Sequence, residues 1–173
     1  QVQKKWGVWD DVLCPGKEQT FKFLEGVLDE VCELFPSQYI HIGGDECSKA
    51  LWKKCPDCQK RIKEEKLKNE EELQSYLIRR IEKFLISNKR KMIGWEEILE
   101  GGLAPEATVM AWKSDTPAGS IAIKEHHDVI RCPSEFCYFN HYNVKDPANE
   151  PLAYRGNVTL EKAYNFDPVP SGF

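Results

Sequence analysis

Four short apolar segments, separated by helical patterns, constrain the fold of this chain more than any other feature. They lie at residues 39–42, 91–95, 108–112 and 128–131 and are rich in Ile, Val and Met. Strands that are apolar on both faces and alternate with helices are typical of a parallel α/β sheet. We therefore predict an α/β fold in which these four segments are parallel strands.

Helical periodicity fills the intervals between the predicted strands. Apolar residues recur every three or four positions over residues 21–35, and Pro36 ends that pattern. We expect a second, long helix that starts in the charged stretch 60–72 and continues with an apolar face over residues 73–85.

The last third of the chain carries weaker signals. A short amphipathic segment lies at residues 117–125, between the third and fourth predicted strands. The proline-rich run 133–173 has little periodicity, apart from a short helix predicted at residues 160–164. No internal repeat or low-complexity linker divides the chain.

Polar or aromatic side chains follow the carboxyl end of each predicted strand. They are Asp45 and Glu46, then Trp95, then Trp112, and a cluster around Tyr138. In a (β/α)8 barrel these strand ends converge on one pocket, whereas an open doubly wound sheet uses only its switch point. The pattern favours a TIM barrel, and because a complete barrel needs about 250 residues, the barrel is expected to be incomplete.

Composition excludes two classes of partner. The 173 residues include 24 Lys and Arg against 28 Asp and Glu, and this net charge of -4 argues against a nucleic-acid partner. No apolar run approaches the roughly 20 residues that a membrane-spanning helix needs, so no membrane segment is expected. The chain starts at Gln1 with neither an initiator Met nor a signal-like stretch, and we expect its true N-terminus to be missing.

Seven cysteines are many for a chain of this length, and an odd number cannot all pair internally. Cys55 and Cys58 have the two-residue gap of a zinc or redox half-site, and Cys47 lies nearby in sequence. A closed zinc site needs four ligands, usually from a second such pair, and the sequence has none. Three alternatives remain for these residues: a metal site, a disulfide among the three, or free thiols. The predicted functional site includes no metal.

The segment from His41 to Glu46, His-Ile-Gly-Gly-Asp-Glu, carries the clearest chemistry. Two glycines after a strand let the backbone bend and a ligand approach closely. Neighbouring residues of an extended strand point to opposite faces, so only such a bend brings Asp45 and Glu46 into one pocket. Ordinary retaining glycosidases place two carboxylates about 5–5.5 Å apart, usually on separate strands. A consecutive pair suits another division of labour, in which one residue protonates the leaving group and the other orients a nucleophile that belongs to the substrate.

Four blocks in the correct order resemble glycoside hydrolase family 20, the β-N-acetylhexosaminidases. His41 to Glu46 is similar to the family's His-x-Gly-Gly-Asp-Glu signature, and residues 94–98 are similar to its Gly-Trp-Asp/Glu-Glu-Ile block. Residues 111–112 resemble its next strand end, and residues 138–140 resemble its Tyr-x-Asp block. The resemblance implies that residues 1–173 are one partial catalytic barrel domain, covering roughly the fourth to seventh strands of a (β/α)8 barrel.

The resemblance implies a retaining hydrolase of terminal N-acetylglucosamine or N-acetylgalactosamine that works by substrate-assisted catalysis. The acetamido oxygen of the sugar would attack its own anomeric carbon and form an oxazoline-like intermediate. Glu46 would be the general acid and then the base, and Asp45 would accept the acetamido N–H. The other expected substrate-binding residues are Trp95 and Trp112 as walls for the acetamido methyl, Tyr138 as donor to the acetamido oxygen, and Asn140, His41 and Trp52.

Several of these residues also have a structural interpretation. An Asp-Glu pair after glycines is commonly a helix N-cap. His41 suits a buried hydrogen-bonding residue at the strand end better than a catalytic base. Trp52 is expected to pack in its loop unless it stacks on the aglycone sugar.

Asn140 departs from the family pattern, which has Asp at this position. Asparagine keeps a hydrogen-bonding group but lacks the charge, which weakens binding of a sugar hydroxyl by about 1 kcal/mol. The alternative function is therefore a non-catalytic N-acetylhexosamine-binding pseudoenzyme, and a cysteine-based metal or redox module is a third hypothesis.

The resemblance also sets expectations for partners and location. The partners would be glycans that contain N-acetylhexosamine, the location would be periplasmic or secreted, and no cofactor is implied. The open edges of a partial barrel invite pairing with another copy. We therefore expect the isolated 173 residues to self-associate or to hydrolyse substrate very weakly.

Overall fold

The computed structural model of the chain describes residues 4, 5, 7–114, 117–144, 146, 148 and 150–169. It divides into two compact units, residues 1–108 and 109–173. The elements of the first unit are α1 (Glu18–Leu34), β1 (Tyr39–His41), the 3-10 helix η1 (Trp52–Lys54), α2 (Pro56–Glu64), α3 (Glu70–Ser87), β2 (Lys91–Trp95) and the 3-10 helix η2 (Glu96–Leu99). The elements that follow are β3 (Thr108–Ala111), α4 (Ala118–Lys124), β4 (Val129–Arg131), α5 (Ser134–Cys137), β5 (His141–Tyr142), β6 (Tyr154–Asn157) and α6 (Leu160–Tyr164).

Parallel strand pairs form the framework of both units. β1 pairs with β2, with Ile40 opposite Met92, and β3 pairs with β4, with Met110 opposite Ile130. Parallel neighbours need a crossover connection, which α2 and α3 provide between β1 and β2 and α4 provides between β3 and β4. The predicted α/β fold with parallel strands is confirmed, and each strand lies within one residue of its predicted bounds.

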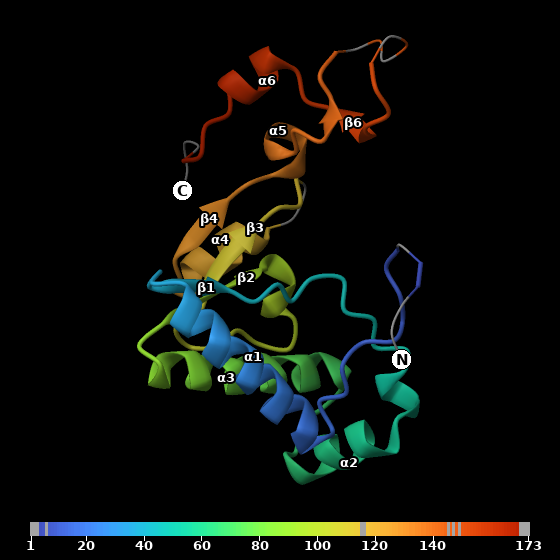
Figure 1. Cartoon of the computed structure of the whole chain (residues 1–173), viewed down its shortest axis with the longest axis vertical. Helices are drawn as coiled ribbons and strands as arrows, with labels where there is room; N and C mark the ends of the chain where they lie inside the picture. The colour runs from blue at the N-terminus through green and yellow to red at the C-terminus, as the bar shows by residue number, and fades with distance from the viewer. Residues whose placement is uncertain are drawn as a thin grey trace. The chain divides into compact units, whose positions relative to one another are not determined.

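The core of the first unit forms where α1 and α3, which lie side by side, meet β1 and β2 (Figure 1). Its buried apolar residues include Phe21, Ile40, Ile78, Ile81, Leu85, Met92 and Ile98. Removing a side chain of this size from water contributes about 1.5–3 kcal/mol. The apolar stripe of α1 is only partly covered, because Val27 is 44% and Leu34 is 74% exposed.

The single long helix predicted from residue 60 onward is wrong, because the chain forms two helices there. α2 ends at Glu64, and the chain turns through Lys66, whose φ is +56°. α3 then starts afresh at Glu70, with the side chain of Asn69 accepting a hydrogen bond of 3.0 Å from the Glu72 N–H. An N-cap of this kind satisfies one of the free amides of a new helix, so the charged stretch contains a stop and a start.

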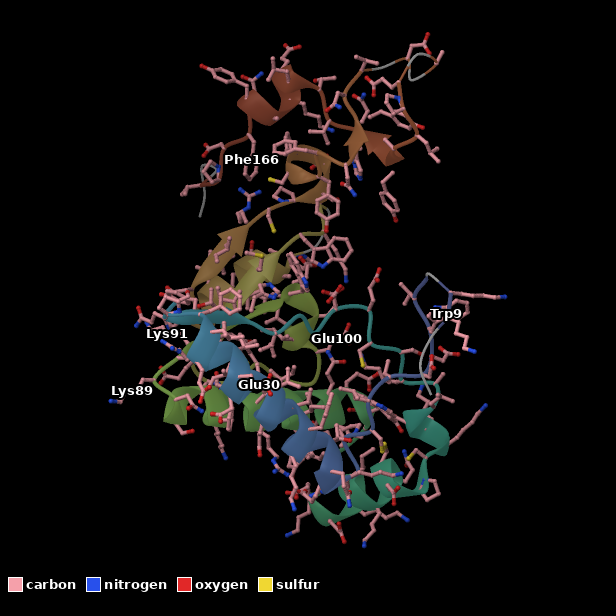
Figure 2. The ribbon with its side chains drawn as sticks, viewed as in Figure 1. Trp9, Glu30, Lys89, Lys91, Glu100 and Phe166 are labelled. Carbon is pink, nitrogen blue, oxygen red and sulfur yellow. The ribbon has the colours of Figure 1, made fainter. Side chains whose placement is uncertain are left out.

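The second unit consists of short elements. α4 contacts β4, the strand that follows it. After β4, α5 contacts α6, and the rings of Phe136 and Phe166 stack there with centroids 5.3 Å apart (Phe166 is labelled in Figure 2). The helix predicted at residues 160–164 is confirmed as α6. The sequence did not predict α5, β5 or β6, because elements of two to four residues are too short to show a period.

Within the described residues, every helix is too short or too polar to span a lipid bilayer.

Candidate active site

The acidic pair lies in a turn built on two glycines after β1. Gly43 and Gly44 have φ values of +76° and +101°, which residues with a side chain rarely adopt. Glu46 also has a positive φ, +49°. This conformation costs a residue with a Cβ about 1–2 kcal/mol, and strained residues of this kind cluster at functional sites. The next helix starts only at Trp52, so the interpretation of Asp45 and Glu46 as a helix N-cap is wrong.

Contacts with β2 and η2 fix the shape of this turn. The Trp95 N–H donates a hydrogen bond of 2.9 Å to the Gly43 carbonyl oxygen. The fully buried Ile98 packs so closely that a Cβ at Gly44 would lie 2.6 Å from its Cγ2, and a Cβ at Gly94 would lie 2.7 Å from the same atom. No side chain fits at that separation without moving Ile98, so both positions require glycine.

Gln74 of α3 holds the turn from a third element. Its Nε2 donates to the carbonyl oxygens of Gly44 and Glu97, each at 3.2 Å, and the residue is only 3% exposed. Sequence reasoning missed Gln74. The available signal was a polar residue next to the apolar face over residues 73–85, since a buried amide in such a position is normally paired with a specific partner.

A hollow of about 370 Å³ opens beside the acidic pair. We call it the acidic hollow. Three segments of the first unit line it, and their residues are Asp11, Val12 and Leu13, then Gly44, Asp45, Glu46, Cys47 and Trp52, then Gln74, Leu77 and Ile78. Its walls are mainly apolar and its polar groups are few, which is the usual composition of a small-molecule site. Asp45 and Glu46 therefore line one hollow although they are consecutive in the chain.

His41 connects the end of β1 to Trp95. Its Nδ1 accepts a hydrogen bond of 3.0 Å from the Gly43 N–H, and its ring meets the indole of Trp95 edge to face at 4.6 Å. Partial burial of the ring lowers the pKa of His41, and the nearby Asp45 carboxylate offsets that shift only in part. His41 makes the hydrogen bond that was expected of it, but it is not the buried residue that was expected, because the residue as a whole is exposed and only part of its ring is shielded from water.

Trp52 is 3% exposed and packs with Cys58, Ile62 and Leu73. Its Nε1 donates a hydrogen bond of 2.9 Å to the carbonyl oxygen of Leu13. Packing in its loop accounts for this environment, although the residue also borders the acidic hollow. Its stacking on an aglycone sugar stays a prediction.

An ion pair secures the loop that follows the acidic pair. The Lys49 Nζ lies 2.7 Å from the carboxylate of Glu100, which is labelled in Figure 2 at the end of η2. Because Glu100 is partly exposed, the pair contributes at most about 1 kcal/mol. Glu100, directly after η2, thus holds the loop that follows the acidic pair. Trp95, directly before η2, holds the glycine turn that precedes the pair.

In the second unit, Trp112 and Tyr138 stack with centroids 6.1 Å apart and planes 11° from parallel. The loops after β3 and β4 bring them together, since the Ser134 N–H donates to the Trp112 carbonyl oxygen at 2.8 Å and the Tyr138 N–H donates to the Ser134 carbonyl oxygen at 3.2 Å. Asn140 follows with an exposed side chain, and its carbonyl oxygen accepts a hydrogen bond from the Tyr154 N–H. The expected aromatic wall and phenol donor are therefore neighbours.

The expected site residues divide between the two units. His41, Asp45, Glu46, Trp52 and Trp95 belong to the first, where they form the surroundings of the acidic turn. The second unit contributes Trp112, Tyr138 and Asn140. The domain prediction, one unit over residues 1–173, stays a prediction.

Comparison with known proteins identifies the family. The chain matches the family model described as glycosyl hydrolase family 20, catalytic domain, over residues 1–172. A beta-hexosaminidase of Porphyromonas gingivalis is 51% identical over 166 residues, which cover 95% of this chain and 21% of that protein. A beta-hexosaminidase of Vibrio furnissii is 38% identical over 161 residues, which cover 92% of this chain and 26% of that protein.

Solved structures of hexosaminidases resemble this chain in fold. The β-N-acetylhexosaminidase of Bacteroides fragilis matches with a TM-score of 0.79 and 33% identity, covering 91% of this chain and 32% of that one. An exo-β-N-acetylglucosaminidase of Vibrio harveyi in complex with N-acetylglucosamine matches with a TM-score of 0.79 and 29% identity, covering 95% of this chain and 26% of that one. These matches confirm the prediction of a partial (β/α)8 barrel.

The chain spans about a fifth to a third of the length of these relatives. The four blocks at residues 41–46, 94–98, 111–112 and 138–140 all fall within the matched residues. Because the family model matches nearly the whole chain, the protein belongs to glycosyl hydrolase family 20, and these residues form part of its catalytic domain.

Proposed function

We propose that the complete protein is a retaining β-N-acetylhexosaminidase that removes terminal N-acetylglucosamine or N-acetylgalactosamine from glycans by substrate-assisted catalysis. The observation that carries this proposal is the position of Asp45 and Glu46, which are consecutive and line one hollow after a glycine turn. Ordinary retaining glycosidases take their acid and their nucleophile from carboxylates about 5–5.5 Å apart that flank the sugar, whereas these two carboxylates share one turn. A nucleophile within the substrate fits this arrangement.

In the first step Glu46 donates a proton to the glycosidic oxygen as the bond to the anomeric carbon breaks. The acetamido oxygen of the sugar attacks that carbon and forms an oxazolinium ion. Asp45 accepts the acetamido N–H, which orients the group and stabilises its developing positive charge. In the second step the Glu46 carboxylate takes a proton from water, the water oxygen attacks the anomeric carbon, and the acetamido group is restored with net retention.

The aromatic residues complete the proposed site. Trp95 and Trp112 provide flat apolar walls for the acetamido methyl and exclude water from it. Tyr138 donates its hydroxyl to the acetamido oxygen, and Asn140 binds a sugar hydroxyl. The parallel stack of Trp112 and Tyr138 supports a shared surface for one planar group. By family membership we also infer that the protein acts in the periplasm or outside the cell.

A substrate series tests the mechanism in the complete protein. Chromogenic β-glucosaminides whose N-acetyl group carries zero, one, two or three fluorines have progressively weaker carbonyl nucleophiles. Substrate-assisted catalysis predicts that kcat falls steeply along the series, and that a β-glucoside without the acetamido group is not hydrolysed. Equal rates along the series would show that the enzyme supplies the nucleophile and would overturn the proposal.

The variant Glu46→Gln tests the proposed acid. We expect its kcat to fall by about 10²–10⁴-fold, the usual contribution of general acid–base catalysis. Glu30→Gln, an exposed change on α1 (Figure 2), is the matched control and should keep full activity. A protein that binds N-acetylglucosamine but never turns over would instead be the binding protein of the alternative hypothesis, which the names of its relatives do not favour.

A further inference from the structure

Three cysteines that the proposed reaction does not use lie together in the first unit. The Cys14 sulfur lies 3.6 Å from that of Cys55 and 3.5 Å from that of Cys58, and all three sulfurs lie within 4.8 Å of one another. We call these residues the cysteine cluster. None of the seven cysteines, all of which the structure describes, forms a disulfide. Cys47, which the sequence associated with Cys55 and Cys58, is not in the cluster.

Backbone packing, rather than side-chain flexibility, brings Cys14 to this position. Gly16 touches the start of α2 so closely that a Cβ on it would lie 2.3 Å from the Asp57 carbonyl carbon and 2.5 Å from the Cys58 nitrogen. A side chain at Gly16 would push the two segments apart. The contact therefore fixes the distance between Cys14 and the Cys55–Cys58 pair, although 41 residues separate Cys14 from Cys55.

The three sulfurs belong to two segments that pack together. Cys55 is the residue before α2, and the fully buried Cys58 lies in the first turn of that helix. Residues three apart in a helix lie on one face, so this turn presents two thiols to Cys14, and metal ligands of this type are thiolates.

The spacing of the sulfurs fits one metal ion. A tetrahedral zinc ion with Zn–S bonds of about 2.3 Å holds its sulfur ligands about 3.8 Å apart, close to the two separations of 3.5 and 3.6 Å. A disulfide would join two of the sulfurs and leave the third unused. We propose that the cysteine cluster binds a zinc ion through three thiolates, with a solvent molecule as the fourth ligand. On binding, the three thiol protons pass to solvent.

The position of the cluster gives the ion a structural role beside the acidic hollow. Leu13, which lines that hollow, directly precedes Cys14, and Trp52 lies at the start of η1, just before Cys55. An ion that joins Cys14 to Cys55 and Cys58 therefore fastens one wall of the hollow to α2. This inference does not depend on the hydrolase activity, because the cysteine cluster includes neither Asp45 nor Glu46.

Metal analysis of the complete, tag-free protein tests the inference. We expect about one zinc ion per chain, and a thiolate-to-metal charge-transfer absorption band when Co²⁺ replaces it. Cys14→Ser should lose the ion and the band and lower Tm, whereas Cys32→Ser, a change in α1 outside the cluster, should keep all three. Cys14 lies in a half-buried loop, so its variant is expected to fold even if that of the buried Cys58 does not.

Three results would overturn the inference. The first is metal-free protein with a Cys14–Cys55 or Cys14–Cys58 disulfide, detected by mass spectrometry of unreduced peptides. The second is metal-free protein with three free thiols that neither binds added Zn²⁺ nor gains Tm from it. The third is zinc that Cys14→Ser retains at full stoichiometry. Copper or iron in place of zinc would overturn the assignment of the ion.

Discussion

The indole Nε1 of Trp52 donates a hydrogen bond of 2.9 Å to the carbonyl oxygen of Leu13, 39 residues earlier in the chain. The bond joins the segment that lines the acidic hollow to the start of η1. Trp52 is 3% exposed and Leu13 is 49% exposed, so the bond is part-buried, with its donor on the protein side. The same two segments meet at the cysteine cluster, so two independent connections hold this wall of the hollow.

Trp52→Phe should lower the free energy of unfolding by about 0.5–1.5 kcal/mol, the usual net contribution of one hydrogen bond, because the Leu13 carbonyl loses its partner at a part-buried site. Urea denaturation of the complete protein measures the change. Trp9→Phe is the matched control, since the Trp9 Nε1 donates to the Lys5 carbonyl oxygen at an exposed site (Trp9 is labelled in Figure 2). Equal losses in the two variants would show that burial of the bond at Trp52 is not important.

Gly94→Ala should destabilise the protein by about 1–3 kcal/mol, the usual cost of overpacking a core. The new Cβ would lie 2.7 Å from the Cγ2 of Ile98 and 3.2 Å from the Gly43 carbonyl oxygen. It would thus displace the turn that bears Asp45 and Glu46, and we expect kcat to fall together with Tm.

Gly26→Ala is the control for this effect. Gly26 lies inside α1, and a Cβ there meets no atom within 4 Å. Alanine should stabilise a helix interior by about 0.5–1 kcal/mol relative to glycine. The two variants make the same chemical change, so opposite signs of the stability change would confirm that the contact with Ile98 is responsible. Similar changes in both would contradict it.

The sequence predicted the elements that have a clear period. The four strands and α1 were predicted within a few residues, because each has several apolar residues in a regular pattern. The break between α2 and α3 was missed because it depends on Asn69, which caps a new helix. Hydrophobic periodicity does not distinguish a capping residue from the other polar residues of a charged stretch. Local capping decided the structure there.

The candidate site was predicted unevenly for a similar reason. Asp45 and Glu46 follow a glycine pair, which is visible in the sequence. Gln74 and Cys14 reach their partners across 30 and 41 residues, and no short motif records such a contact. Trp52 is conspicuous in the sequence, yet only its packing shows that the indole is largely withdrawn from solvent.

His41 should make stability depend on pH. Its Nδ1 accepts the Gly43 N–H, so the neutral ring carries its proton on Nε2, and partial burial lowers the pKa of His41. The unfolded state, with a pKa of about 6.5, therefore binds more protons than the folded state in this window. Stability is full above about pH 6.5 and is lost as pH falls toward the folded-state pKa.

His41→Asn tests this dependence, because its side-chain oxygen accepts the same N–H without titrating. Urea denaturation between about pH 7 and pH 5 should show a smaller loss of stability in the variant than in the wild type. The other three histidines are present in both proteins, so the difference between the two curves isolates His41. Parallel curves would contradict the prediction.

Asn140→Asp restores the residue that the family pattern has at this position. Under the proposed function, a charged acceptor binds a sugar hydroxyl more strongly by about 1 kcal/mol, so KM should fall by about fivefold with kcat little changed. The Asn140 side chain is exposed, and its backbone carbonyl keeps its bond to the Tyr154 N–H whichever side chain is present. Tm should therefore not change.

Asn165→Asp adds the same charge at another exposed position of the second unit and should leave KM unchanged. If KM responds equally to both substitutions, net charge rather than contact with the sugar is responsible, and Asn140 does not bind the hydroxyl.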